Sequence, residues 1–367
     1  MRRLGEIDWD FPSQQSESAF SSLHWHPCRF PSQIPAITIA RLTEPGARIL
    51  DPFMGSATTL VEAQRLSRSS LGIDLNPVSA LMASAKTLQI DAKGVDRMTK
   101  QIELRILKDW TDISIANAPP QVQSQKWYTP KTFIALSKLF EVIGSLDGHQ
   151  KLLAKAAFSS ILLQACRETR HWGYVCDNTT PKSERDADAR ALFINAMRRY
   201  SAAYKERDRF AGPEFKEARV AQGDARQVLS GIASESFDAF VTSPPYFGVA
   251  DYVKAQRLSM EWFEFELEPL RKLEIGARSK RHRKNGASAY GRELTAVFQE
   301  CHRTLRKGKF GVIVFGQSPK REDCEEPFID QLREIGFTIE LRQKRQIPNT
   351  RRLNPSLLDE SVIVVRR

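Results

Sequence analysis

The stretch 242-TSPPY-246 holds the residue types best suited to chemistry on a planar amine. It follows the nearly continuous apolar run 237–241, which predicts a strand buried on both faces. Two prolines cannot continue a sheet ladder, because each lacks a backbone donor and has a fixed φ. We therefore expect a rigid tip that fixes a backbone carbonyl and the Ser243 hydroxyl, while Tyr246 offers a flat face on which a base stacks.

An exocyclic amine on an aromatic base is a poor nucleophile, because its lone pair is delocalised into the ring. Two acceptors directed at its hydrogens favour a pyramidal nitrogen and free the lone pair for in-line attack on a sulfonium methyl. The expected catalysis is orientation and electrostatic stabilisation, with no metal and no covalent enzyme intermediate. The residues to which we assign this chemistry are Ser243, Pro244, Pro245 and Tyr246.

Carboxylates end three other predicted strands. In 51-DPFMGSATTLVEA-63, Gly55 permits a tight turn before a helix, which is where α/β proteins bind ligands. Asp74 follows nineteen residues later and is placed to accept both hydroxyls of a ribose. Asp224, in 222-QGDAR-226, is placed to accept from an adenine amino group.

Each of these signals also has a purely structural reading. The glycine turn can be an ordinary strand–helix junction, and Asp74 or Asp224 can cap the following helix, although Asn76 is the better placed cap before Pro77. The acidic strand ends are harder to dismiss together than singly. Because the chain has no GxGxxG motif and no phosphate-loop lysine, nothing cradles a pyrophosphate, and a nucleoside without phosphates points to S-adenosyl-L-methionine.

Short strands alternate with helices in two separate parts of the chain, which predicts a mainly parallel α/β sheet. We expect a loosely held arm over residues 1–20, a catalytic domain over 21–88 and 219–367, and a helical insertion over 89–218 that is a candidate for target recognition. The predicted strands are 48–53, 70–75, 237–241, 309–316, 337–343 and 360–367, and a further strand and helix are predicted within 219–229. The predicted helices include 58–67, 77–86, 151–167, 186–209, 291–305 and 327–335.

These motifs together resemble those of the amino-methylating DNA methyltransferases, which act on cytosine N4 or adenine N6. DPFMGSATT looks like their cofactor motif DPFxGSGTT, GIDLNP like their ribose-binding acidic motif, and TSPPY like their catalytic motif. Upstream, 26-HPCRFPSQIP-35 resembles the segment that closes over the methionine end of the cofactor. The resemblance covers residues 21–88 and 219–367 and implies a Rossmann-like S-adenosylmethionine-dependent methyltransferase fold.

The resemblance also implies which residues contact the cofactor. They are His26, Phe30, Asp51, Pro52, Phe53, Gly55, Ser56, Thr58, Asp74, Asn76, Asp224 and Ala225. Two departures from the family pattern stand out. Ala57 takes the place of the second glycine, where it could crowd the cofactor and weaken binding, and Arg29 and Cys28 replace the usual lysine and small residue.

Charge favours a polyanionic partner. Lysine and arginine exceed aspartate and glutamate by 11, and the pI is about 9.5. The segment 278-RSKRHRK-284 and the stretch 344-KRQIPNTRR-352 are basic, and we interpret them as phosphate-binding loops rather than solvated charge runs. The DNA-binding candidates are Arg278, Lys280, Arg281, Arg283, Lys284, Arg351 and Arg352. A base in a duplex must be flipped, or met unpaired, to reach the pocket.

The five cysteines are scattered without a CxxC pair, which argues against a zinc site and a disulfide framework. His24 and His26 have the spacing of a metal pair, yet no carboxylate or cysteine nearby completes a site, so we expect no metal. No run of eighteen apolar residues and no signal peptide is visible, so we expect a cytoplasmic protein.

The leading hypothesis is therefore a DNA methyltransferase acting on cytosine N4, because the serine form of the motif is associated chiefly with N4-cytosine enzymes. The same machinery acting on adenine N6 is the nearest alternative. An RNA base methyltransferase and a catalytically silent nucleic-acid-binding relic, for which Ala57 is the best argument, are the others. A restriction endonuclease partner and the oligomeric state stay open at this point.

Overall fold

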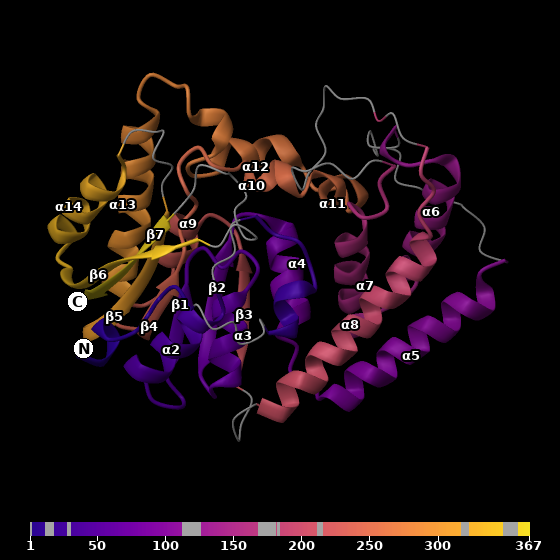
Figure 1. Cartoon of the computed structure of the whole chain (residues 1–367), viewed down its shortest axis with the longest axis horizontal. Coiled ribbons are helices and arrows are strands. Elements are labelled where there is room, and N and C mark those ends of the chain that lie inside the picture. Colours follow the sequence, from indigo (N-terminus) through magenta and orange to yellow (C-terminus); the bar gives the residue numbers. More distant parts are fainter. Residues whose placement is uncertain are drawn as a thin grey trace.

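The computed structural model describes residues 2–11, 18–27, 31–111, 126–167, 181, 184–210, 216–316, 323–347 and 359–367. Its centre is a seven-stranded sheet in the order β3-β2-β1-β4-β5-β7-β6 (Figure 1). β7 runs antiparallel to both of its neighbours, and the other pairs are parallel. The strands are β1 (Arg48–Asp51), β2 (Ser69–Asp74), β3 (Ala218–Gln222), β4 (Phe237–Thr242), β5 (Leu305–Gly316), β6 (Thr338–Gln346) and β7 (Asp359–Arg366). The expected Rossmann-like, mainly parallel sheet is confirmed.

Helices cover both faces of the sheet, which is why its central strands are apolar on both sides. Along β5, Val312 and Val314 face one helical layer, while Ile313 and Phe315 face the other. The flanking helices are α2 (Gln33–Leu42), α3 (Thr58–Arg65) and α4 (Pro77–Lys86) on one side, and α9 (Ala225–Ser230), α13 (Gly286–Thr304) and α14 (Glu325–Ile335) on the other.

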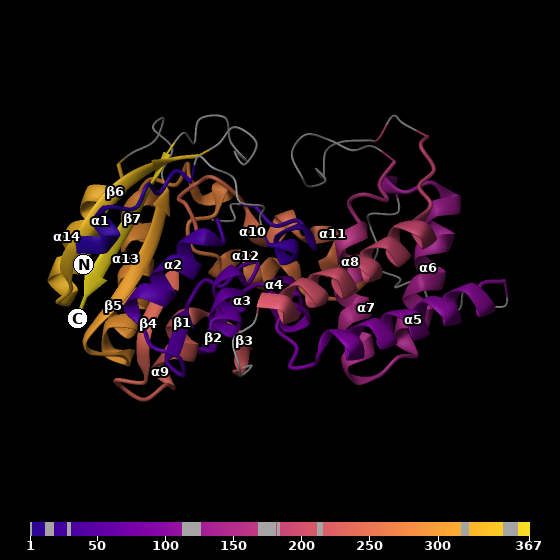
Figure 2. The same cartoon turned by 60° about the horizontal axis from the view of Figure 1, so that its bottom comes forward.

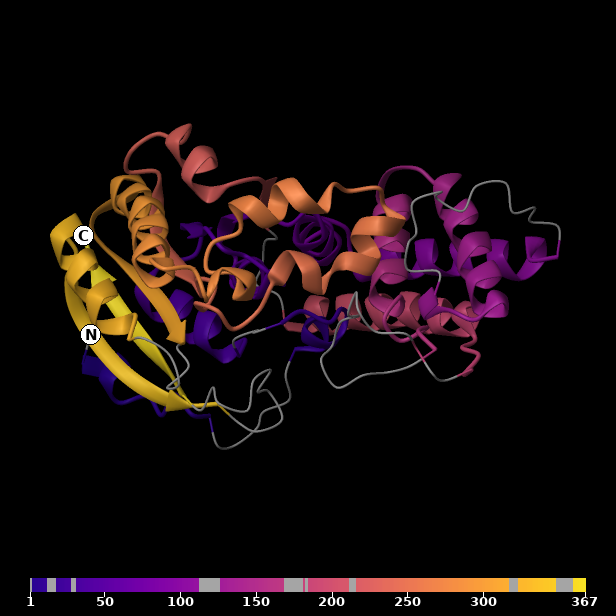
Figure 3. The same cartoon turned by 90° about the horizontal axis from the view of Figure 1, so that it is seen from above.

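Short elements join β4 to α13 and cross the middle of the molecule when it is viewed from above (Figure 3). They are α10 (Tyr252–Ala255), α11 (Arg257–Trp262), α12 (Leu267–Leu273) and the 3-10 turn η3 (Arg278–Lys280). Because they follow the TSPPY motif directly, they lie at the same edge of the sheet as the strand ends.

The insertion between α4 and β3 is a group of long helices beside the sheet (Figures 1 and 2). It contains α5 (Ala92–Asp109), α6 (Pro130–Gly144), α7 (Gly148–Ile161) and α8 (Ala189–Phe210). Its aromatic core includes Phe158, Phe193 and Tyr200, and Trp262 of α11 enters this core with its ring 5.2 Å from that of Phe158. The insertion is therefore packed against the catalytic part rather than tethered to it.

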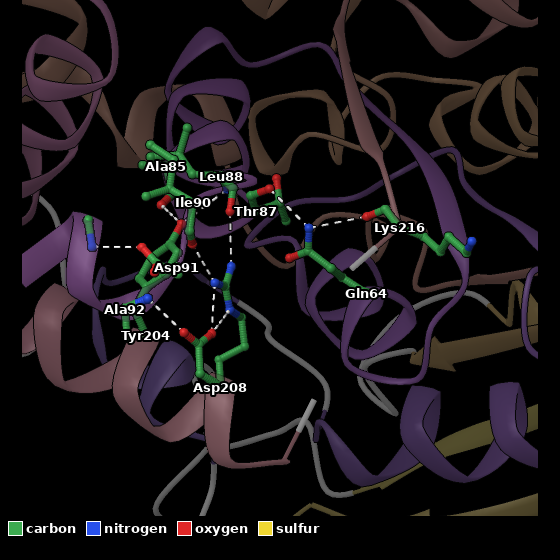
Figure 4. A network of polar contacts seen from close by, with 12 residues as sticks. Gln64, Ala85, Thr87, Leu88, Ile90, Asp91, Ala92, Tyr204, Asp208 and Lys216 are labelled. Atoms are coloured by element: carbon green, nitrogen blue, oxygen red, sulfur yellow. Dashed lines mark hydrogen bonds and ion pairs between the residues drawn. The ribbon is translucent and has the colours of Figure 1, made fainter. Parts of the chain in front are cut away.

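Polar contacts between α8 and the chain after α4 hold the insertion in place (Figure 4). The Tyr204 hydroxyl donates to the carbonyl of Ala85 at 2.9 Å and accepts from the backbone N–H of Leu88 at 3.1 Å. One turn later, Arg207 donates to the carbonyl of Leu88 and Asp208 accepts from the N–H of Ala92. Buried backbone groups at the start of the insertion thus find partners on its last helix, α8.

The N-terminal segment corrects one expectation. We predicted a loosely held arm over residues 1–20, but residues 2–11, which include α1 (Arg2–Gly5), pack on the sheet. Leu4 and Trp9 are buried against the α2 side of the sheet, beside Val362 and Val364 of β7. The backbone N–H of Gln346 also donates to Asp10. The segment therefore belongs to the core of the fold.

Among the described residues, none of the helices is long and apolar enough to cross a membrane.

Candidate active site

A cleft of about 890 Å³, part of it open to solvent, lies at the carboxyl ends of β1, β2 and β4. The predicted site residues that line it are His26, Pro52, Phe53, Gly55, Ser56, Thr58, Asp74, Asn76, Asp224, Ala225, Ser243, Pro244 and Pro245. The chain therefore brings the nucleoside-type carboxylates and the serine–proline motif to one cavity from strands almost two hundred residues apart.

The turn from β1 to α3 shows why glycine is needed at its centre. Gly55 has a φ of 45°, and a Cβ at this position would lie 3.0 Å from Cε1 of His26. Ala57, two residues later, also adopts a left-handed conformation with a φ of 66°. Its methyl group is fully buried in a cluster with Met54 and Leu60 and does not line the cleft. The structure gives no sign of the crowding that we expected from Ala57.

Lys86 supports the turn between β1 and α3, a role that sequence reasoning missed. Its ammonium group donates to the backbone carbonyl of Ser56 at 2.8 Å, and the residue is buried. A lysine at the end of an apolar helix gives no signal of such a contact, because snorkelling to solvent is the common arrangement.

Asp74 is both a structural and a candidate binding residue. Its two carboxylate oxygens accept from the backbone N–H groups of Gly55 at 2.9 Å and Asn76 at 2.8 Å. Burial raises its pKa to about 6, although these hydrogen bonds oppose the shift. A carboxylate accepts about four hydrogen bonds, so Asp74 retains acceptor capacity for ribose hydroxyls in the cleft that it lines.

Asp51 does not line the cleft, which corrects its assignment to the cofactor. It is completely buried and accepts from the Thr242 hydroxyl at 2.7 Å and from the backbone N–H of Phe53 at 3.1 Å. Burial also raises its pKa to about 6. Asp51 therefore links the end of β1 to the residue before Ser243, so it positions the cofactor turn and the catalytic motif relative to each other.

Asn76 and Asp224 are both helix caps and candidate cofactor-binding residues. Asn76 caps α4 by accepting from the N–H of Val78, and Asp224 caps α9 by accepting from the N–H of Arg226. Asp224 also forms an ion pair with the Arg226 guanidinium. Both residues nevertheless line the cleft, so capping fixes their orientation without removing them from it.

The catalytic motif is held rigidly. The Pro245 carbonyl accepts from the Tyr290 hydroxyl at 2.9 Å, and the Ser243 hydroxyl donates to the Tyr246 hydroxyl at 3.2 Å. Tyr246 itself is only 2% exposed, lies against Gly316, and donates to Glu360 at 2.7 Å. We expected its ring to offer a stacking face, but in this structure the ring does not line the cleft.

Glu274 is a further carboxylate that lines the cleft and that sequence reasoning missed. One of its oxygens accepts from the backbone N–H of Tyr252, and the other is buried with no hydrogen-bond partner among the described residues. Burial raises the pKa of Glu274 to about 8. No motif marks this residue, because it lies between α12 and η3 and reaches the cleft only through the fold.

The basic segment 278–284 is only partly available to DNA. Lys280 is buried, and its ammonium donates to the backbone carbonyls of Lys272 and Glu274, so its assignment to DNA is wrong. Arg278 and Arg281 are half-buried, while Arg283 and Lys284 are exposed. Phe30, Arg351 and Arg352 lie outside the described residues, as do Cys28 and Arg29.

Both ring nitrogens of His24 have protein partners. Its ring nitrogens lie 2.7 Å from the Trp25 carbonyl and 2.7 Å from the Ser159 hydroxyl of the insertion. Within the described ranges, no group of three or more histidine, cysteine, aspartate or glutamate residues is arranged to hold a metal ion.

Comparison with known proteins finds similarity to methyltransferases. Residues 4–84 match the family model described as DNA methylase. The Type II methyltransferase M.MvaI of Kocuria varians is 25% identical over 236 residues, which span 60% of this chain and 52% of the relative. M.SmaI of Serratia marcescens, another Type II methyltransferase, is 38% identical over 92 residues, which span 25% of this chain and 24% of the relative.

Among solved structures, the rRNA methyltransferase aviRa of Streptomyces viridochromogenes overlays with a TM-score of 0.41 at 11% identity, covering 96% of this chain and 94% of that one. The chain spans about half the length of the curated relatives M.MvaI and M.BsoBI. The resemblance of the chain to the amino-methylating DNA methyltransferases is confirmed by these similarities. S-adenosyl-L-methionine is the cofactor that the family uses, in agreement with the cofactor predicted from the sequence.

Proposed function

We propose that the protein transfers a methyl group from S-adenosyl-L-methionine to an exocyclic amine of a base in DNA, and that this amine is N4 of cytosine. The observation that carries the proposal is the shared cleft, in which Ser243 and its prolines lie beside Asp74 and the Gly55 turn. The choice of cytosine rests on the serine at position 243, because the rest of the cleft suits either amine.

The residues that would hold the cofactor follow from the cleft. Asp74 would accept from the ribose hydroxyls, Asp224 from the adenine amino group, and the Gly55 turn with His26 would contain the methionine end. The cofactor supplies a methyl group on a positively charged sulfur, which leaves as a neutral thioether. Ala57 does not oppose this fit, because its methyl group packs into the core instead of the cleft.

The protein's own contribution to the transfer is orientation. The Ser243 hydroxyl oxygen and a carbonyl of the proline pair accept the two hydrogens of the target amine, which localises the lone pair on nitrogen. On receiving the methyl group, the amine nitrogen would release one of its protons to solvent. The Tyr290 hydroxyl restrains the motif by donating to the carbonyl of Pro245.

We further propose that DNA is bound through exposed cations near the cleft and that the base is flipped into it. Arg283 and Lys284 are the described candidates for phosphate contact, since both are exposed just after η3. We assign target recognition to the insertion, which packs against α11 and beside α4, the helix whose Ser79 lines the cleft. A restriction endonuclease is the proposed functional partner, because the matched relatives are named as Type II methyltransferases.

Ser243→Ala tests the assignment. We expect kcat for methyl transfer to DNA to fall by about 10²- to 10³-fold, since an acceptor for the amine is lost. The Kd for the cofactor should change little, because Ser243 does not hold the nucleoside. The matched control is Ser259→Ala, a buried serine bonded to Ser159 outside the cleft, which should retain kcat. Equal kcat values for the two variants would exclude Ser243 from catalysis.

A further inference from the structure

The Ser243 hydroxyl lies at the end of a chain of polar contacts that leaves the cleft. Ser243 donates to the Tyr246 hydroxyl at 3.2 Å, and Tyr246 donates to Oε2 of Glu360 at 2.7 Å. Oε1 of Glu360 pairs with the guanidinium of Arg345, whose Nε donates to the backbone carbonyl of Trp9 at 2.8 Å. Tyr246, Glu360 and Arg345 are all buried, so this chain is shielded from water.

The direction of these hydrogen bonds is fixed by chemistry. Arg345 can only donate, and the carboxylate of Glu360 can only accept. The single hydrogen of the Tyr246 hydroxyl is therefore used on Glu360, which leaves the phenol oxygen to accept from Ser243. The Ser243 hydrogen in turn points at Tyr246, and its lone pairs remain available to the cleft that Ser243 lines.

We propose that Glu360, held by Arg345, is a positioning residue that orients the hydroxyl hydrogen of Ser243 away from the cleft, so that Ser243 presents an acceptor to the amine of the target base. The inference rests on the proposed function, because it supplies the polarity that amine activation requires. Without this series of hydrogen bonds, a serine hydroxyl is free to rotate and can point its hydrogen at the amine. That hydrogen would repel the N–H of the amine instead of accepting it.

The alternative is that the buried ion pair of Glu360 and Arg345 has a purely structural role. A second buried ion pair in the protein provides a matched comparison. Glu325, at the start of α14, is also buried and pairs with Arg342 at 2.8 Å. It accepts from the hydroxyl of Ser361, the residue next to Glu360, but it has no described contact with the TSPPY motif. Removal of its charge should perturb stability without altering the polarity of Ser243.

The informative variant is Glu360→Gln. Because Arg345 needs an acceptor, the amide oxygen stays on Arg345 and the amide nitrogen faces Tyr246. The phenol must then accept from the amide and donate to Ser243, which turns the serine hydrogen toward the cleft. We expect kcat to fall on the order of 10- to 100-fold, while the Kd for the cofactor and the KM for DNA stay close to those of the wild type.

The experiment compares wild type, Glu360→Gln, Glu325→Gln, Tyr246→Phe and the Glu360→Gln/Tyr246→Phe double variant in single-turnover methyl transfer to DNA, with cofactor binding measured by titration. Tyr246→Phe keeps the ring but removes the hydroxyl oxygen that connects Glu360 to Ser243 (the relay from Glu360 through Tyr246 to Ser243). It therefore tests this relay even if Glu360→Gln does not fold. The fold-losses in kcat of the two single variants should not multiply in the double variant, because each change interrupts the same relay.

A Glu360→Gln kcat within about twofold of that of Glu325→Gln, or a double variant whose loss is the product of the single losses, would overturn the relay while leaving the proposed function intact. A wild type that binds the cofactor but transfers no methyl group to DNA would contradict the proposed function, and the relay with it.

Discussion

At the scale of single residues, the cleft depends on carboxyl groups that the protein keeps largely out of water. Burial raises the pKa of Asp51 and Asp74 to about 6 and that of Glu274 to about 8. Each carboxyl group holds a different part of the site, since Asp51 joins two strand ends, Asp74 holds the Gly55 turn, and Glu274 holds the segment after the catalytic motif. Asp74 and Glu274 line the same cleft, and perturbed carboxyl groups that converge on one cavity are typical of a functional site.

Glu274→Gln should change how stability depends on pH. The folded pKa of Glu274 is raised from 4.5 to about 8, so the folded protein keeps a proton that the unfolded chain releases. This contribution to stability is fully present below the unfolded pKa and is lost as the pH rises toward 8. Glutamine stays neutral and avoids the loss, so the variant should be more stable than wild type at about pH 8.5, by roughly 3 to 5 kcal/mol, and similar at about pH 5.

Urea denaturation of the cofactor-free protein at both pH values measures this difference. Glu268→Gln on α12, whose exposed carboxylate pairs with Arg271, is the control and should follow the wild type. A Glu274→Gln variant that loses stability with pH as steeply as the wild type would show that the proton is not held by Glu274.

Ala57→Gly tests whether the departure from the family motif matters. The left-handed φ of Ala57 favours glycine, but its methyl group fills a buried cluster and does not line the cleft. These effects oppose each other, so the free energy of unfolding should change by less than about 1 kcal/mol. The Kd for the cofactor, measured by calorimetry, should change by less than about threefold. An increase in affinity of tenfold or more would mean that Ala57 does crowd the cofactor.

At the scale of elements, the local signals predicted the parts of the fold that are local in sequence. The helix predicted at 77–86 is α4, begun by a cap at Asn76 and a proline in its first turn, and the strands before it are correct to within two residues. The site turn was predictable for the same reason, since the strand, glycine and helix are consecutive. By contrast, the burial of Leu4 and Trp9 depends on β7, and the carbonyl of Trp9 accepts from Arg345, more than three hundred residues away.

Contacts between residues far apart in the sequence produce no periodic pattern that could predict them. Contacts that the sequence pattern does not indicate also explain the site residues that were missed or misassigned. Lys86 and Lys280 look like surface lysines, yet both donate to buried backbone carbonyls. The TSPPY motif could not indicate that Tyr246 turns toward Glu360 on β7.

Trp9→Ala tests whether the N-terminal segment is a structural element. Its indole is buried against β7 and lies in an edge arrangement with Phe11. Removal of a buried tryptophan leaves a cavity, so we expect a loss of about 3 to 5 kcal/mol in urea denaturation. The partly exposed Phe265 is the control, and Phe265→Ala should cost much less. If the segment were a loose arm, the two variants would be equally stable.

At the scale of the whole molecule, the cleft lies at the carboxyl ends of β1, β2 and β4. The insertion lies to one side of the sheet (Figure 3). The chain carries a net charge of +11, which favours a polyanion but does not say where it binds. Arg283 and Lys284 are exposed on the segment that follows Glu274, close in sequence to the cleft. In the proposed complex, phosphate contacts at these residues would hold the DNA backbone beside the cleft into which the base is flipped.

The double variant Arg283→Gln/Lys284→Gln should weaken binding to duplex DNA at low salt. The slope of log affinity against log salt should become shallower by roughly 2, because two phosphate contacts are lost. Lys93→Gln/Arg97→Gln, which removes two exposed charges from α5, is matched in charge and should keep the slope. Equal slopes for the two double variants would move the DNA contact away from the 278–284 segment.

The measurement that tests the central claim most directly is the identity of the methylated nucleoside. The protein is incubated with DNA and methyl-labelled S-adenosyl-L-methionine, the DNA is digested to nucleosides, and the labelled nucleoside is identified by mass. Our account predicts labelled N4-methylcytosine. Labelled N6-methyladenine would contradict the base assigned to Ser243 while preserving the cleft, and no label on DNA would contradict the proposed function itself.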